Sequence, residues 1–191
     1  ALIGPFSVEW ISVTHSTPGT CALCISVGQT RILHTADWKM DAAPVVGPAW
    51  SDQRFEALGD QGVDAVICDS TNALQAGRSV TEGRVAQGLN EAILRCEGRV
   101  VVGCFSSNIA RIQTLSQIAA DTGRYLGILG RSAAGMASCA QQVGLFPDQF
   151  KPIHGAQLGY LPPREAAAAR AEARAEARVG VVRAVVVKGL A

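Results

Sequence analysis

The chain has 191 residues, of which 48% are hydrophobic and 17% are charged. This composition supports a sizeable core and excludes disorder along the whole chain. The 17 basic and 16 acidic residues give a net charge of +1, so nucleic-acid binding would need a local patch or a metal site rather than a global basic excess. The apolar runs are too short to cross a membrane, and the first residues lack the pattern of a secretory signal.

The six cysteines mostly lie in apolar runs such as VICDS and VVGCF. Free cysteine in such a setting behaves as a small buried hydrophobe, which indicates a reduced, cytoplasmic protein. Cys21 and Cys24 have the spacing of a redox or zinc pair. We interpret them as structural, because there is no second such pair and both lie in an alternating, strand-like stretch.

The first forty residues have the patterns of β-strands. FSVEWISVT (6–14) alternates apolar and polar residues, and CALCISV (21–27) and TRILHT (30–35) predict a hairpin that turns at Gly28. A segment rich in proline and glycine, DAAPVVGPAWSD (41–52), follows and separates this β-rich part from the rest.

Strands and helices alternate from about residue 60 to 145. VDAVICDS (63–70), RVVVGCF (99–105) and YLGILG (125–130) are short apolar runs that predict buried strands. Three helices are predicted between and after them. Each has a capping signal at its start. The first helix has a capping box of Ser79 and Glu82, the second has Asn108 as its cap, and the third has Ser132. The alternation is typical of parallel βαβ units.

Two of these helices have clear inward faces. The apolar positions recur at helical spacing behind each start. They are Val85, Leu89, Ile93 and Cys96 in the first helix, and Ile109, Ile112, Leu115 and Ile118 in the second.

The C-terminal part differs in composition. Residues 166–178, AAAARAEARAEAR, favour a helix by composition, and we interpret them as a solvated helix. The charges recur at every second residue, however, and a helix would stack like charges four residues apart. The last residues, 179–191, are strand-like.

Two histidines and an aspartate follow the predicted strands of the N-terminal part. His15 lies in VTHS, and His34 and Asp37 lie in HTADWK. An imidazole and a carboxylate are usual zinc ligands, and a carboxylate can bridge two metal ions. Hydrogen-bonded structural roles for His15 and Asp37 are the alternative, since the chain has three histidines and no HxH motif.

Hydroxyl and amide side chains follow two of the later strands. Because the carboxyl edge of a parallel sheet and the start of a helix favour anionic ligands, these positions are candidates for phosphate contact. The alternative is a plain turn in one segment and a helix cap in the other. The side chains are Asp69, Ser70 and Thr71 in CDSTNA, and Ser106, Ser107 and Asn108 in FSSNIAR.

Taken together, four motifs resemble ribonuclease J, the bacterial branch of the metallo-β-lactamase/β-CASP nucleases. They are VTHSTP, ILHTADWKMD, CDSTNA followed by SVTEGRV, and GRVVVGCFSSNIARIQ, in that order, and the resemblance runs from about Gly4 to Pro163. It implies an α/β fold in which part of a metallo-β-lactamase αββα sandwich (1–60) precedes part of a β-CASP domain (61–163). Residues 164–191 form an atypical tail.

The resemblance also implies roles for matching residues. His15 matches a zinc ligand, and Asp37 matches the aspartate that bridges two zinc ions. Asp69 matches the acidic residue that orients a ligand histidine, so Asp37 and Asp69 are the expected catalytic residues. Ser70 and Thr71, together with Ser106, Ser107 and Asn108, fall where RNA is expected to bind. Lys39, beside Asp37, is expected to point away from the metal.

Some family motifs are expected outside these 191 residues, namely HxHxDH and the two late β-CASP histidines. Because the resemblance weakens abruptly after Pro163, we also hypothesise that residues 164–191 are a frameshifted reading. The implied function is zinc-dependent, 5′→3′ exonucleolytic and endonucleolytic hydrolysis of single-stranded RNA in the cytoplasm by a homo-oligomer. The alternatives are a truncated chain that is inert by itself, a thioester or lactone hydrolase of the same superfold, and a nucleotide-binding α/β domain.

Overall fold

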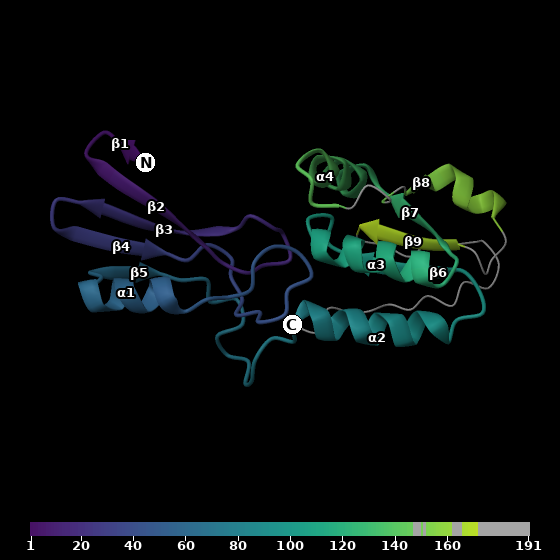
Figure 1. Cartoon of the computed structure of the whole chain (residues 1–191), viewed down its shortest axis with the longest axis horizontal. Coiled ribbons are helices and arrows are strands. Elements are labelled where there is room, and N and C mark those ends of the chain that lie inside the picture. The colour runs from purple at the N-terminus through teal and green to yellow at the C-terminus, as the bar shows by residue number, and fades with distance from the viewer. Residues whose placement is uncertain (147–149, 151, 162–165, 172–191) are drawn as a thin grey trace. The chain divides into compact units, whose positions relative to one another are not determined.

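The computed structural model describes residues 1–146, 150, 152–161 and 166–171 (Figure 1). Two compact units divide the chain, one over Ala1–Thr81 and one from Glu82 onward. The short strand that follows residue 60 belongs by its contacts to the first unit, and the predicted domain boundary after residue 60 stays a prediction. The predicted mixed α/β class is confirmed. None of the described helices combines the length and apolar character that a membrane crossing needs.

The first unit contains a five-stranded sheet in the order β1-β2-β3-β4-β5. Neighbouring strands are antiparallel except for β4 and β5, which are parallel. The predicted first strand and the predicted hairpin are both confirmed. The strands are β1 (Leu2–Ile3), β2 (Phe6–Ser12), β3 (Cys21–Val27), β4 (Thr30–His34) and β5 (Ala65–Ile67).

The apolar run before Cys68 forms β5, but it is not a buried strand. It pairs with β4 at the end of the sheet order, and Val66 and Ile67 are 58% and 55% exposed. A short apolar run has the same sequence pattern in the middle of a sheet and at its end, so the pattern could not distinguish the two places. The chain reaches β5 from β4 through α1 (Gln53–Gln61), which gives a βαβ unit.

Helix α1 packs on this sheet through one fully buried residue. Leu58 is 1% exposed and joins a core of alternate residues from β2 and β3. The helix is also held by an ion pair, because the Arg54 Nε and guanidinium N–H groups donate to the Glu9 carboxylate at 2.6 and 2.5 Å. These hydrogen bonds from Arg54 lower the pKa of Glu9.

The second unit contains a four-stranded sheet in the order β6-β9-β7-β8, in which each pair of neighbouring strands is parallel. Helices α3 and α4 both pack against β7 and β9, and α2 packs against α3. The strands are β6 (Val100–Cys104), β7 (Tyr125–Leu129), β8 (Ile153–His154) and β9 (Ala166–Ala171). The helices are α2 (Glu82–Leu94), α3 (Ile109–Asp121), α4 (Arg131–Gln142) and the 3₁₀ helix η1 (Gly155–Tyr160).

The predicted inward faces of α2 and α3 are confirmed. Leu89 and Ile93 of α2 are buried, with Val85 and Cys96 packed against the same core. The four predicted residues of α3 are all buried, and they are Ile109, Ile112, Leu115 and Ile118.

The predicted helix caps have mixed outcomes. Asn108 caps α3 as expected, since its side chain accepts a hydrogen bond from the Arg111 backbone N–H at 2.9 Å. The other two predictions are wrong. Helix α2 begins at Glu82 itself, so Ser79 and Glu82 do not form a capping box, and α4 begins after Gly130 rather than at Ser132. In α2, the Glu82 carboxylate accepts from Arg111 instead.

Residues 166–171 form strand β9, which corrects the predicted helix. The strand lies between β6 and β7, and Ala168 pairs with Val101 on one side and Gly127 on the other. Two parallel neighbours supply partners for the backbone on both sides, which local propensity cannot anticipate. The charge period of two residues is the period of a strand. Residues 172–178 of the predicted helix lie outside the described residues.

A substitution of Ala168 tests the position of β9. Ala168→Pro removes a backbone N–H from the middle of the sheet and leaves a neighbouring acceptor unpaired, so we expect a loss of about 1–3 kcal/mol in the free energy of unfolding. Ala168→Ser keeps the N–H and is the matched control. Urea unfolding followed by circular dichroism measures both, and equal stability of the two variants would contradict the pairing.

Candidate functional site

The ends of three strands bring the predicted site residues of the first unit to one edge of its sheet. Strands β2, β4 and β5 run in the same direction, because β3 is antiparallel to β2 and β4, and β5 is parallel to β4. Shortly after the ends of these strands come His15, Asp37 and Asp69, in that order. The topology therefore gathers residues that lie far apart in the sequence.

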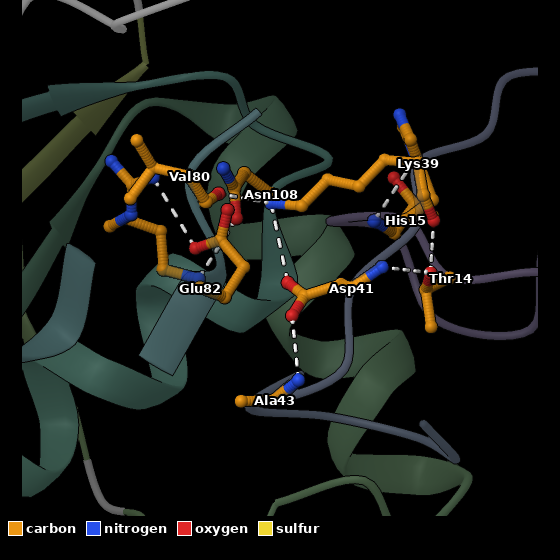
Figure 2. Close-up of polar contacts among 10 residues, drawn as sticks. Thr14, His15, Lys39, Asp41, Ala43, Val80, Glu82 and Asn108 are labelled. Carbon is orange, nitrogen blue, oxygen red and sulfur yellow. Dashed lines mark hydrogen bonds and ion pairs between the residues drawn. The ribbon is translucent and has the colours of Figure 1, made fainter. Parts of the chain in front are cut away.

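A single backbone bridge joins the segment of His15 to the segment of Asp37. Thr14 and Lys39 form an isolated antiparallel bridge, and the Lys39 backbone N–H donates to the Thr14 carbonyl at 2.9 Å. The Thr14 hydroxyl donates to the Lys39 carbonyl and accepts from the Asp41 backbone N–H at 3.0 Å. Figure 2 shows these contacts. We refer to this set as the Thr14–Lys39 bridge.

Asp41 is a fully buried carboxylate that the sequence analysis missed. Asp41 is 1% exposed, and the Lys39 ammonium lies 3.3 Å from its carboxylate. The Ala43 backbone N–H also donates to this carboxylate at 2.9 Å (Figure 2). One signal could have found the pair, because Lys39 and Asp41 are two residues apart and side chains with that spacing share a side of an extended chain.

Asp69 links the ends of β4 and β5. Its backbone N–H donates to the Thr35 hydroxyl at 3.1 Å, and the Thr35 N–H donates to the Ile67 carbonyl at 2.9 Å. The Asp69 carboxylate accepts from the Thr71 hydroxyl at 2.6 Å and from the Thr71 N–H at 2.9 Å. These hydrogen bonds lower the pKa of Asp69, and the charge of nearby His15 lowers it further.

His15 and Asp69 are therefore close enough to interact electrostatically. The His15 Nδ1 accepts a hydrogen bond from the Thr17 backbone N–H at 3.3 Å. Among the described residues, no hydrogen bond joins His15 to Asp69. The orienting role of Asp69 stays a prediction.

Asp37 lies exposed in the loop after β4. The preceding residue, Ala36, has a φ of +54°, in the left-handed region that favours glycine. The Ala36 N–H donates to the His34 Nδ1 at 3.1 Å and so holds the start of this loop. A strained backbone before Asp37 costs roughly 1–3 kcal/mol and persists only where the surroundings hold it in place.

His15 and Asp37 carry donor groups that zinc accepts. In the described part of the chain, no group of three or more histidine, cysteine, aspartate or glutamate side chains is placed to hold a metal ion. Catalytic zinc usually takes three protein ligands and keeps one open position. The role of His15 and Asp37 as zinc ligands stays a prediction.

The candidate phosphate-contacting residues divide into two groups. Ser70 and Thr71 are exposed in the turn after β5, where the Ala73 N–H donates to the Ser70 carbonyl at 3.0 Å. Ser106, Ser107 and Asn108 lie between β6 and α3 in the second unit. Both groups follow strand ends, as predicted.

Asn108 and its neighbours already satisfy the first turn of α3. The Asn108 side chain accepts a hydrogen bond from the Arg111 backbone N–H. The Asn108 carbonyl accepts from the Ile112 N–H, and the Ser107 carbonyl accepts from the Ile109 N–H. The Arg111 guanidinium lies 3.3 Å from the Glu82 carboxylate, and both side chains are nearly buried. Asn108 is thus a structural cap of α3.

Comparison with protein families gives one match. Residues 97–177 match the family model described as ribonuclease J, beta-CASP domain. This match continues past Pro163 to residue 177. The frameshift hypothesis relied on a loss of resemblance after Pro163, and the match does not show that loss up to residue 177.

Curated relatives extend the similarity over the first unit as well. The chain is 40% identical over 160 residues to ribonuclease J of Sinorhizobium meliloti, covering 84% of this chain and 28% of the relative. It is 39% identical over 161 residues to ribonuclease J of Mycolicibacterium smegmatis, with 84% and 29% covered. Ribonuclease J of Helicobacter pylori is 32% identical over 142 residues, with 74% and 20% covered. The chain thus spans less than a third of the length of these relatives.

A solved structure supports the fold. A protein of unknown function from Enterococcus faecalis V583 aligns with a TM-score of 0.59 at 15% identity, covering 91% of this chain and 43% of that one. At this identity the similarity concerns the fold alone.

The turn at Asp69 gives a prediction about pH. Thr71→Val removes the hydroxyl that contributes most to the low pKa of Asp69, so that pKa should rise toward its ordinary value. A carboxyl group whose pKa is lowered in the folded state stabilises the fold above its ordinary pKa, and this stabilisation is lost as the pH falls through the lowered pKa. With a higher pKa for Asp69, Thr71→Val should therefore lose the stabilisation from Asp69 at a higher pH than the unaltered chain does. Carboxyl NMR titration measures the shift.

The matched control is Thr71→Ser, which keeps the hydroxyl. It should leave the pKa of Asp69 low. An Asp69 that titrates identically in the valine and serine variants would contradict the arrangement of the turn.

Proposed function

Since this chain corresponds to part of a ribonuclease J, we propose that it serves in the hydrolysis of single-stranded RNA, by 5′→3′ exonucleolytic and endonucleolytic cleavage in the cytoplasm. The single observation that carries the proposal is the similarity to ribonuclease J across both units, at up to 40% identity. The gathering of His15, Asp37 and Asp69 at one sheet edge supports it. The similarity to a β-CASP domain favours this function over a thioester or lactone hydrolase of the same superfold.

The proposal assigns a role to each residue of the edge. His15 and Asp37 are proposed as two of the ligands of a zinc site, and Asp69 as the residue that orients the site from outside the ligand shell. Catalytic zinc usually takes three protein ligands, so His15 and Asp37 would supply two of them. The low pKa of Asp69 keeps its carboxylate anionic near neutral pH.

RNA contact is proposed for the hydroxyls that follow the strand ends. Ser70 and Thr71 in the first unit, and Ser106 and Ser107 in the second, are suited to phosphate oxygens, which are the same in every sequence. Asn108 supports this contact indirectly, because it fixes the start of α3. A homo-oligomer is also proposed, on the resemblance to the family.

A second candidate is that the chain by itself binds RNA without cleaving it. The observation that favours it is the number of donors, since His15 and Asp37 together provide fewer ligands than catalytic zinc requires. Both candidates agree on the substrate class. They differ in whether hydrolysis needs ligands beyond those in the described residues.

One experiment tests both candidates. The 191-residue chain is mixed with a 5′-labelled single-stranded RNA, with and without added zinc, and binding and cleavage are followed together. We expect salt-sensitive binding of RNA and no cleavage, because the ligand set is incomplete. A duplex of the same sequence is the control and should bind more weakly. Absence of RNA binding would contradict the proposed function.

Cleavage by the chain alone would instead contradict the second candidate. The variant Asp37→Asn distinguishes such cleavage from a contaminating nuclease. It retains the size of the side chain and removes the charge, so it should abolish cleavage that depends on this edge and leave contaminating cleavage unchanged.

A further inference from the structure

A small hollow lies in the first unit beside the candidate site. It has a volume of about 180 Å³ and is lined by Trp38, Lys39, Met40, Arg78 and Ser79. The first three of these residues directly follow Asp37 in the chain, and the other two precede α2. None of them was a candidate in the sequence analysis.

An aromatic row gives the hollow a rigid wall. The Trp38 ring lies 5.5 Å from the Trp50 ring at 35°, and Trp50 stacks on Phe55 at 5.0 Å and 12°. All three rings pack against the core of the first unit. Trp38 is half-buried and lines the hollow, and its packing on Trp50 means that it needs little ordering when a ligand binds.

The Lys39 side chain joins the two walls. Its ammonium donates to the Val80 carbonyl at 3.0 Å and lies 3.3 Å from the buried Asp41 carboxylate (Figure 2). The segment of residues 78–80 is thereby tied to the segment of residues 38–40. Because the Asp41 carboxylate offsets its charge, Lys39 acts as a structural link rather than as the main cation of the hollow.

Arg78 supplies the available positive charge. It is exposed, and no hydrogen bond or ion pair to it is found within the described ranges. Ser79 adds an exposed hydroxyl, and Met40, 56% exposed, adds an apolar thioether. The hollow thus combines an aromatic face and an apolar rim with a guanidinium and a hydroxyl.

The geometry points to a nucleotide subsite, in which a base packs on Trp38 and Met40 and its phosphate binds Arg78 and Ser79. Pockets for drug-sized ligands measure about 300–1,000 Å³, so this hollow suits a single base rather than a larger cofactor. Aromatic stacking combined with a basic group is the usual way of binding single-stranded nucleic acid without reading its sequence. The source of the nucleotide, as a residue of an RNA strand, rests on the proposed function.

The test measures nucleotide binding by this chain with matched variants. The probes are a short fluorescein-labelled oligoadenylate, followed by anisotropy, and AMP, adenosine and inorganic phosphate, followed by tryptophan fluorescence. We expect Arg78→Gln to weaken binding of the oligoadenylate roughly three- to tenfold, the loss typical of one hydrogen bond at an exposed site. Arg95→Gln makes the same charge change at an exposed position of the second unit and should bind like the unaltered chain.

Trp38→Phe gives a second, spectroscopic readout. AMP and the oligoadenylate should quench the fluorescence of the unaltered chain more than adenosine or phosphate do, and this quenching should be lost in Trp38→Phe. The control is Trp10→Phe, because Trp10 is 55% exposed on β2 and lies outside the hollow. Arg78 is exposed, so its variant keeps the test valid even if the Trp38 variant folds poorly.

The outcomes separate the subsite from the proposed function. Equal binding by the Arg78 and Arg95 variants, with quenching retained in Trp38→Phe, overturns the subsite while RNA binding stands. Absence of oligoadenylate binding by the unaltered chain overturns RNA as the source and contradicts the proposed function. Quenching by AMP alone, lost in Trp38→Phe, supports a nucleotide subsite and excludes an RNA strand as its occupant.

Discussion

The Thr14–Lys39 bridge is the contact on which the candidate site depends. It fixes the segment that carries His15 against the segment that carries Asp37, and it uses both the backbone and the hydroxyl of a Thr14 that is 5% exposed. The parallel pairing of β4 and β5 then adds Asp69 to the same edge. These links are made by backbone groups and the Thr14 hydroxyl, so the placement of the three side chains does not rely on their own charges.

The same bridge also shapes the hollow beside the site. Residues Trp38 and Met40 flank Lys39 on its two sides, and the Lys39 ammonium reaches both the buried Asp41 carboxylate and the Val80 carbonyl. Removing one partner of a buried ion pair leaves an uncompensated charge and typically costs about 3–5 kcal/mol. The edge and the hollow therefore share the segment that follows β4, in which the pair of Lys39 and Asp41 is structural, whereas Arg78 is available to ligands.

Features set by local sequence were predictable. The hairpin of β3 and β4 follows from alternation around Gly28, and α3 follows from the Asn108 cap and its apolar spacing. Features that depend on pairing between strands far apart in the sequence were not predictable. The place of β5 depends on β4, and the conversion of residues 166–171 into β9 depends on two strands far earlier in the chain. The positions of His15, Asp37 and Asp69 at strand ends could be read from the motifs, whereas the burial of Asp41 could not, because it depends on Thr14 and Lys39 together.

The most direct test of this account is an amide chemical-shift map of the 191-residue chain titrated with a single-stranded oligoribonucleotide. The account predicts that the shifted amides of the first unit cluster at His15, at residues 37–40 and at residues 69–79, because RNA meets the sheet at that edge. The exposed opposite end of the sheet, around Val27 at the end of β3 and the β3–β4 turn that follows it, should stay unchanged. Shifts that spare the edge and appear at that turn would contradict the central claim.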